Sequence, residues 1–154
     1  MACEFSANAV QTVNPGESVV FTNSPVPCNR GFVRHRDETG NFLLRGNVRQ
    51  SSCGCCPNSA LYLVDFGANI AIPTGGTVEA ISLALTLDGG TLPTTEMMVT
   101  PAAVEEFFNV SDATIVNVWR NCCQSLTVRN ISEQPILVQN ANIIFSRPDM
   151  NVTY

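Results

Sequence analysis

Hydrophobic and polar residues alternate in short runs along most of the chain, and Gly, Pro, Asn and Asp separate these runs. A two-residue period is typical of β-strands with one buried face. Two of the separators are strong turn signals, Asn14-Pro15-Gly16 and Asp37-Glu38-Thr39-Gly40. The predicted strands are Gln11–Val13, Ser18–Thr22, Gly31–Arg36, Asn41–Arg45, Leu61–Phe66, Thr77–Leu87, Met97–Thr100, Ala113–Trp119, Ser125–Asn130, Ile136–Gln139 and Ala141–Ser146.

One short helix is predicted, Pro101–Phe108, with Pro in its first turn and Glu105 and Glu106 following. The absence of crossover helices disfavours a parallel α/β sheet. Strands that recur about every 8–12 residues are typical of sandwiches and barrels. We therefore expect an all-β fold, a single jelly-roll β-sandwich of about ten antiparallel strands. One domain should fill residues 1–154, with residues 1–8 as an N-terminal arm and residues 148–154 as a C-terminal tail.

Composition supports one compact domain and narrows the classes of partner. Hydrophobic residues make up 45% of the 154 residues and charged residues 14%, which suits a buried core and excludes a disordered tail. The net charge of −5 argues against a nucleic-acid partner. No apolar run reaches the roughly 20 residues that span a bilayer, and the start MACEFSANAV has no secretory signal. We expect no membrane partner, and folding in the cytoplasm.

The basic residues are all Arg, eight in number. Arg is favoured over Lys in packed interfaces, because its planar fork is weakly hydrated and binds carboxylates at two points. A candidate interface patch comprises the five that lie close in sequence, Arg30, Arg34, Arg36, Arg45 and Arg49. The alternative is a solvated hairpin whose charges are balanced by Asp37 and Glu38.

Seven cysteines are the sharpest candidate chemistry, and all but Cys3 form a candidate disulfide or thiol cluster: Cys28, Cys53, Cys55, Cys56, Cys122 and Cys123. We expect one or two disulfides that join the Cys53–Cys56 segment to Cys28 or to the Cys122 and Cys123 pair. Adjacent cysteines in a strand point to opposite faces, so these last two should not share a partner. Zinc-like thiolate ligation and buried free thiols are the alternatives. The odd total leaves at least one thiol free or paired across subunits.

Catalytic motifs are absent from the sequence. It has no Gly-x-Ser-x-Gly elbow, no phosphate-binding loop and no His-Glu-x-x-His helix. Glu105 and Glu106 would be neighbours on a helix, and such neighbours do not face one substrate. We expect no enzyme activity, no cofactor and no resident metal.

The later strands resemble a known family. The chain is similar to the tumour-necrosis-factor-like and complement-head-like jelly rolls that terminate bacterial collagen-like surface proteins, and to short gut-bacterial and phage proteins. The resemblance covers roughly residues 8–147 and is carried by Ala60–Phe66, Ile72–Val78, Ile81–Gly89, Val99–Ala103, Cys122–Cys123, Leu126–Asn130 and Gln139–Phe145. It implies a compact homotrimer of ten-stranded jelly rolls that serves as a structural or adhesive head.

The chain departs from the collagen-like members because it has no Gly-X-Y repeat. The resemblance therefore favours a free-standing trimer docked on a larger particle. The expected function is a capsid decoration or head-fibre protein on the virion surface of a bacteriophage, with the major capsid protein or another virion surface protein as its partner. The alternative is an adhesive or glycan-binding head of a collagen-like protein on a bacterial spore or cell surface, with a host surface glycan as the ligand.

Overall fold

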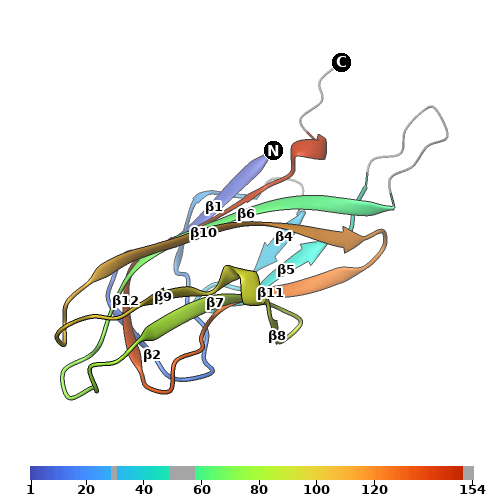
Figure 1. The fold of residues 1–154 in the computed structure, drawn as a ribbon. Helices are drawn as coiled ribbons and strands as arrows, with labels where there is room; N and C mark the ends of the chain where they lie inside the picture. The colour runs from blue at the N-terminus through green and yellow to red at the C-terminus, as the bar shows by residue number, and fades with distance from the viewer. Residues whose placement is uncertain (29–30, 49–57, 151–154) are drawn as a thin grey trace.

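The computed structural model describes residues 1–28, 31–48 and 58–150, which form two antiparallel sheets packed face to face (Figure 1). Sheet I has the strand order β10-β6-β12-β1-β3, and β2 pairs with β12. Its strands are β1 (Ala2–Ala7), β2 (Gln11–Val13), β3 (Asn23–Val26), β6 (Ser59–Ala71), β10 (Phe108–Trp119) and β12 (Ile136–Ser146). The expected jelly-roll sandwich is confirmed.

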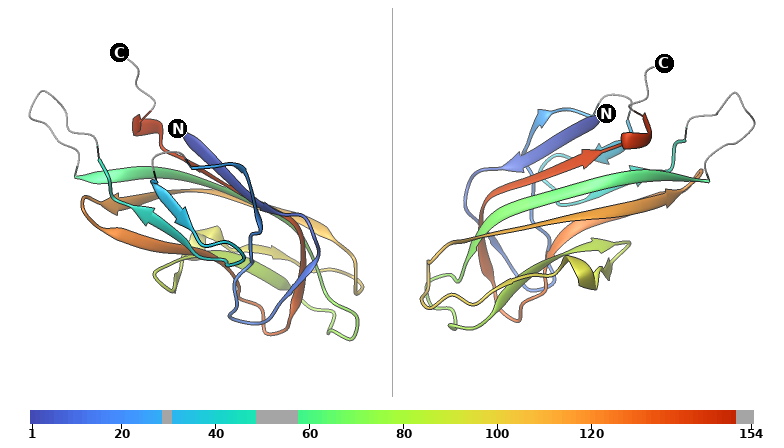
Figure 2. Two further views of the ribbon diagram at one scale, coloured as in Figure 1. Left: turned by 180° about the vertical axis from the view of Figure 1, so that it is seen from behind. Right: turned by 45° about the horizontal axis from the view of Figure 1, so that its top comes forward.

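Sheet II has the strand order β4-β5-β11-β7-β8, and β9 pairs with β7. Its strands are β4 (Val33–His35), β5 (Phe42–Arg45), β7 (Ile81–Leu87), β8 (Gly90–Thr91), β9 (Met97–Val99) and β11 (Cys123–Asn130). The two views of Figure 2 show the layers from behind and tilted so that the top comes forward. The strands β9 and β10 lie next to each other at the same edge of the two sheets.

The core lies between the sheets and follows from the alternation in the sequence. In β6, the buried positions recur every second residue from Ala60 to Ile70, and the intervening residues face outward. One end of the core is aromatic: the Phe42 ring lies 5.0 Å from that of Phe145 and 5.1 Å from that of Phe21, centroid to centroid. These tilted and edge-on arrangements are the favoured ones for aromatic pairs.

The predicted helix over Pro101–Phe108 is wrong. Residues 101–107 form an irregular loop, and β10 begins at Phe108. Within the loop Glu105 has a φ of 57°, and its N–H donates to the carbonyl of Ile72 over 2.7 Å, so its backbone bonds to the end of β6 rather than to a helical turn. The helical segments in the described ranges are two short 3₁₀ turns, η1 (Pro93–Thr95) and η2 (Pro148–Met150).

The N-terminal residues form a strand instead of the expected arm. β1 pairs along its whole length with β12, from Ala2 opposite Ser146 to Ala7 opposite Ala141, so the start of β1 lies beside the end of β12 (Figure 1). The two last predicted strands are one, β12, whose pairing with β6 shifts register between Gln139 and Asn142. Ser18–Thr22, predicted as a strand, makes isolated bridges through Ser18 and Phe21.

Candidate functional site: an exposed apolar sheet face

The outer side of sheet I carries large apolar side chains that are exposed to solvent, so they do not stabilise the fold of a monomer by burial. Ile115 is 61% exposed and Trp119 is 65% exposed, both on the edge strand β10. Ile115 lies opposite Leu63 of β6, and Leu61, two residues before Leu63, lies opposite Asn117. We call the following set the sheet face: Leu61, Leu63, Ala113, Ile115, Trp119 and Ile144. An apolar face of this kind is typical of a contact surface.

The other half of the same outer side is polar. The side-chain amide of Asn109 donates to the Asn69 side chain over 3.2 Å, and Asn142 bonds to the carboxylate of Glu4. Between the two halves stands Asp65, which is exposed and lies opposite Ala113 of β10 and Ile144 of β12. The outer side of sheet I is thus divided along its strands into an apolar end near Trp119 and a polar end.

A second apolar surface lies along the open side of the sandwich. Met98 of β9 is 61% exposed, and three more apolar side chains are exposed: Val104 and Phe107 in the loop before β10, and Phe108 at the start of β10. We call these four residues the edge patch. Phe108 pairs with Ile70 of β6 and Trp119 with Ser59, so this patch lies at the start of β10, at the polar end of sheet I and away from Trp119.

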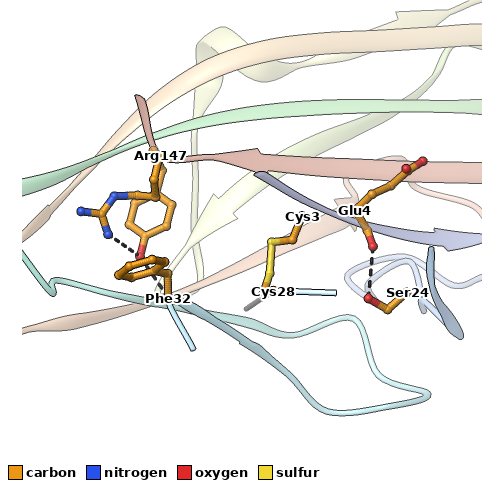
Figure 3. Close-up of a disulfide and its surroundings, with 7 residues drawn as sticks. Cys3, Glu4, Ser24, Cys28, Phe32 and Arg147 are labelled. Carbon is orange, nitrogen blue, oxygen red and sulfur yellow. Dashed lines mark hydrogen bonds between the residues drawn. A yellow bond between two sulfur atoms is a disulfide. The ribbon is translucent and has the colours of Figure 1, made fainter. Parts of the chain in front are cut away.

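Cys28 is bonded to Cys3, not to the cysteines expected for it (Figure 3). Their Cα atoms are 4.9 Å apart, within the usual range for a disulfide. The reason is the pairing of β1 with β3, which sets Glu4 opposite Val26 and brings Cys3 beside the residues that follow β3. Sequence reasoning missed this partner because it placed Cys3 in an arm outside the sheets.

The remaining predicted cysteines divide into two groups. Cys122 and Cys123 are exposed free thiols at the hairpin between β10 and β11. Cys53, Cys55 and Cys56 lie outside the described residues, so a bond between the two groups stays a prediction. No group of three or more His, Cys, Asp or Glu side chains suited to a metal ion occurs among residues 1–28, 31–48 and 58–150.

The structure describes three of the five residues of the predicted arginine patch. Arg34 and Arg36 are exposed and Arg45 is half-buried, all three on or next to the β4–β5 hairpin. Arg30 and Arg49 lie outside the described residues. The structure therefore puts three of the five arginines on one hairpin of sheet II. Within the described ranges none of them forms a salt bridge.

Among the described residues, Arg147 is the arginine with the most side-chain bonds, and sequence reasoning missed it. It is 2% exposed, bonds to Asp149 over 2.7 and 2.9 Å, and donates to the carbonyl of Asn47 over 2.9 Å. Its guanidinium carbon lies 4.8 Å from the ring centres of both Phe32 and Tyr62, as Figure 3 shows for Phe32. Burial lowers the pKa of Arg147, but the bond to Asp149 and its charge outweigh burial, so the pKa is raised and the guanidinium stays charged.

Tyr62 joins this cluster to sheet II. Its hydroxyl donates to the carbonyl of Arg45 at 2.6 Å and lies 3.0 Å from that of Phe32. Burial raises the pKa of Tyr62 and outweighs the lowering by the charge of Arg147. The result is a buried polar network at the end of the sandwich where β1 begins and β12 ends. It is positioned to hold the fold together, since its donors and acceptors bond to one another and to the backbone.

The acidic pair Glu105 and Glu106 is exposed in the loop before β10. Within the described ranges, no helix has the length and apolar character needed to span a bilayer.

Comparisons with known proteins identify the fold. No model of a known protein family matches the chain, and no curated protein sequence is detectably similar to it. Solved structures are similar in shape. The Eiger TNF from S. frugiperda has a TM-score of 0.65 at 11% identity, with 100% of this chain and 98% of that chain covered.

Two further solved structures are similar to this chain in shape. The globular domain of zebrafish complement 1qA protein has a TM-score of 0.62 at 12% identity, with 96% of each chain covered. Murine APRIL at pH 5.0 has a TM-score of 0.64 at 10% identity, with 96% of this chain and 99% of that chain covered. The protein has the fold of the tumour-necrosis-factor and complement globular heads, as the sequence resemblance implied.

Proposed function

We propose that the protein is a non-enzymatic structural protein that assembles as a homotrimer and decorates the outside of a bacteriophage capsid. The observation that carries this proposal is the sheet face, above all Ile115 and Trp119, which together expose a large apolar area on a strand edge. The edge patch provides a second, different apolar surface.

Two different apolar surfaces on one chain suit a head-to-tail contact. In such a contact one surface of each copy meets the other surface of the next, and the assembly closes into a ring when the rotation permits. The edge patch of one copy would cover the sheet face of its neighbour. A ring of three copies is the state implied by the resemblance to tumour-necrosis-factor-like and complement-head-like jelly rolls.

Charge further restricts the arrangement. The outer side of sheet I carries Glu4 and Asp65, and the edge patch is flanked by Glu96, Glu105 and Glu106, whereas Arg34 and Arg36 lie on the β4–β5 hairpin of sheet II. Assembly through these surfaces therefore depends on apolar burial rather than on ion pairs. The hairpin with Arg34 and Arg36 then stays exposed on the outside of the ring, where it can meet acidic groups on a capsid protein.

The mechanism of decoration is mechanical. Each docked trimer adds interface area to the particle and so raises the free energy needed to disrupt it. The virion surface is favoured over other particles by the sequence resemblance to short phage proteins.

A two-part experiment tests the proposal. Light scattering on the purified protein, with and without reductant, should give the mass of three chains in both conditions, and Trp119→Ser should lower it. Quantification of the chain in purified phage particles should then give a fixed stoichiometric copy number. A monomeric wild type contradicts the trimer, and absence from particles contradicts the decoration role.

A second candidate function is an adhesive or glycan-binding head on a bacterial spore or cell surface. The observation that favours it is the polar half of sheet I, where Asn69, Asn109 and Gln139 present amides that can donate to and accept from sugar hydroxyls. Saturable binding on a glycan array that is lost in Asn109→Ala would support this candidate over the first.

A further inference from the structure

The strands of sheet I carry acidic side chains and no basic ones. The chain has eight arginines and no lysine, and all eight arginines lie outside β1, β2, β3, β6, β10 and β12. Asp65 of β6 and Glu4 of β1 lie on the outer side of the sheet, whereas Asp112 of β10 has the parity of the buried Val110 and faces inward. The outer side of sheet I is therefore an anionic surface as well as a partly apolar one.

Asp65 stands among the apolar residues of the sheet face. It lies opposite Ala113 of β10 on one side and opposite Ile144 of β12 on the other, and Leu63 is the outward residue before it on β6. Side chains directly opposite each other in antiparallel strands have Cβ atoms about 4.5–5.5 Å apart. A partner that covers the sheet face therefore also covers Asp65 and removes water from its carboxylate.

The charged groups around Asp65 do not offset its charge. The outward residues of β10 and β12 are uncharged, and Glu4 lies one strand beyond β12 in the same row, roughly 10 Å away. Arg120 follows β10 seven residues after the residue opposite Asp65, roughly 23 Å along the strand. Arg147 is buried and already bonded to Asp149. On this side of the sheet, Asp65 thus has one like charge near it and no cation.

The surface proposed to cover the sheet face is acidic too. The edge patch is flanked by Glu96, two residues before Met98, and by Glu105 and Glu106, which precede Phe107. All three Glu side chains are exposed. Contact between the two surfaces brings like charges together while it removes water from them. Both effects favour the neutral, protonated form of a carboxyl group.

We propose that assembly of the trimer is coupled to proton uptake by Asp65, so that the trimer is strengthened as the pH falls. This inference rests on the proposed function and adds the regulation of its contact surface. In a free chain the carboxylate is exposed to water, whereas in an assembled chain it is covered and binds a proton more readily. Because the assembled state then binds more protons than the free state, acid shifts the equilibrium toward the trimer. The gain ends below about pH 4, where a carboxyl group in water is itself protonated.

The size of the effect follows from the number of protons. One proton per copy makes three per trimer, so the trimer dissociation constant should fall by up to about 1,000-fold per pH unit where the assembled carboxyl is protonated and the free one is not. The concentration at which half of the chains are trimeric scales as the square root of that constant. It should therefore fall by up to roughly 30-fold per pH unit in this range.

The test is sedimentation velocity over a dilution series in reductant, between about pH 8 and about pH 5 at constant salt. The half-trimer concentration of the wild type should fall at least about tenfold across this range. Asp65→Asn removes the charge and keeps the size of the side chain, so it should assemble at lower concentration than the wild type at the upper pH and lose most of the pH dependence.

The matched control is Asp37→Asn. Asp37 is exposed on the β4–β5 hairpin of sheet II, so this variant removes the same charge from a different surface. The control is needed because the net charge of −5 at pH 7 also falls in acid, which weakens repulsion between any two copies. Asp37→Asn should keep the pH dependence of the wild type.

Dilution calorimetry in two buffers of different ionisation enthalpy counts the protons directly. At the lower pH the wild type should release about one proton per chain on dissociation, and Asp65→Asn should release fewer. A trimer whose dilution curve does not move with pH, or an Asp65→Asn variant that keeps the full shift, would overturn the inference. An equal loss of pH dependence in Asp37→Asn would also overturn it, since net charge would then be the cause. Each of these results leaves the trimer standing, whereas single chains at every pH and concentration refute the trimer of the proposed function as well.

Discussion

Replacing Ile115 by Ser should weaken the proposed trimer without weakening the fold. Full burial of a large aliphatic side chain stabilises by about 1.5–3 kcal/mol, and Ile115 is 61% exposed in the monomer. Covering that fraction contributes about 0.9–1.8 kcal/mol per copy, and about 3–5 kcal/mol over three copies. With about 1.4 kcal/mol for each factor of ten, the trimer dissociation constant should rise roughly 100- to 10,000-fold.

The assay is sedimentation velocity over a dilution series in reductant. The concentration at which half of the chains are trimeric scales as the square root of a monomer–trimer constant, so it should rise roughly 10- to 100-fold. Val78→Ser is the matched control, because Val78 is 51% exposed but lies in the loop between β6 and β7. An unchanged dilution curve for Ile115→Ser, or an equal shift for Val78→Ser, would refute the assignment of the sheet face.

Three further predictions concern Tyr62 in the buried polar network, the disulfide between Cys3 and Cys28, and Asp65 on the outer side of sheet I. Tyr62→Phe should cost about 1–3 kcal/mol in urea unfolding, because buried carbonyl acceptors lose a donor. Its raised pKa adds a pH effect: folded Tyr62 stays protonated where the unfolded chain ionises, so wild-type stability should hold below pH 10.0 and fall above it, and the variant should show a smaller fall. Replacing Cys3 and Cys28 together by Ser should cost about 3–4 kcal/mol, from a sequence separation of 25. Asp65→Asn should lower the half-trimer concentration in the dilution series, because a charge surrounded by apolar neighbours opposes burial; an unchanged value would place Asp65 outside the interface.

Much of the fold could be predicted because alternation fixes both the strands and their faces. In Leu61–Phe66 the alternation puts Tyr62, Val64 and Phe66 on one face, and these are the residues that are buried. The sequence of the strand Ala113–Trp119 has apolar residues on both of its faces. This pattern indicates that both faces of the strand are covered, and the prediction did not use it. The helix over 101–108 was wrong because a proline and two glutamates also suit a loop, and only the bond to Ile72 decides between them.

The site was harder to predict than the fold because its residues meet through pairing across the chain. Cys3 and Cys28 are brought together by the register of β1 with β3, which no local pattern encodes. Likewise Arg147 follows a strand and reads as an ordinary surface residue until the packing places it between two aromatic rings. In both cases, the pairing of strands that are far apart in the sequence brings the residues together.

The Arg147 cluster and the disulfide together explain how a face for assembly can be kept rigid. The N–H of Arg147 donates to the carbonyl of Met1 over 2.8 Å, and the adjacent Cys3 is tied to Cys28, so β12, β1 and the segment after β3 are fastened at one end. A Lys at 147 would lack the planar fork that reaches Asp149 twice while it stacks on Tyr62. In the strand order of sheet I, β12 and β1 lie on the side of β6 that is away from β10, so these ties leave the sheet face uncovered. A face that is already ordered before contact loses less conformational entropy on association, so the internal ties would favour the proposed trimer without touching the partner.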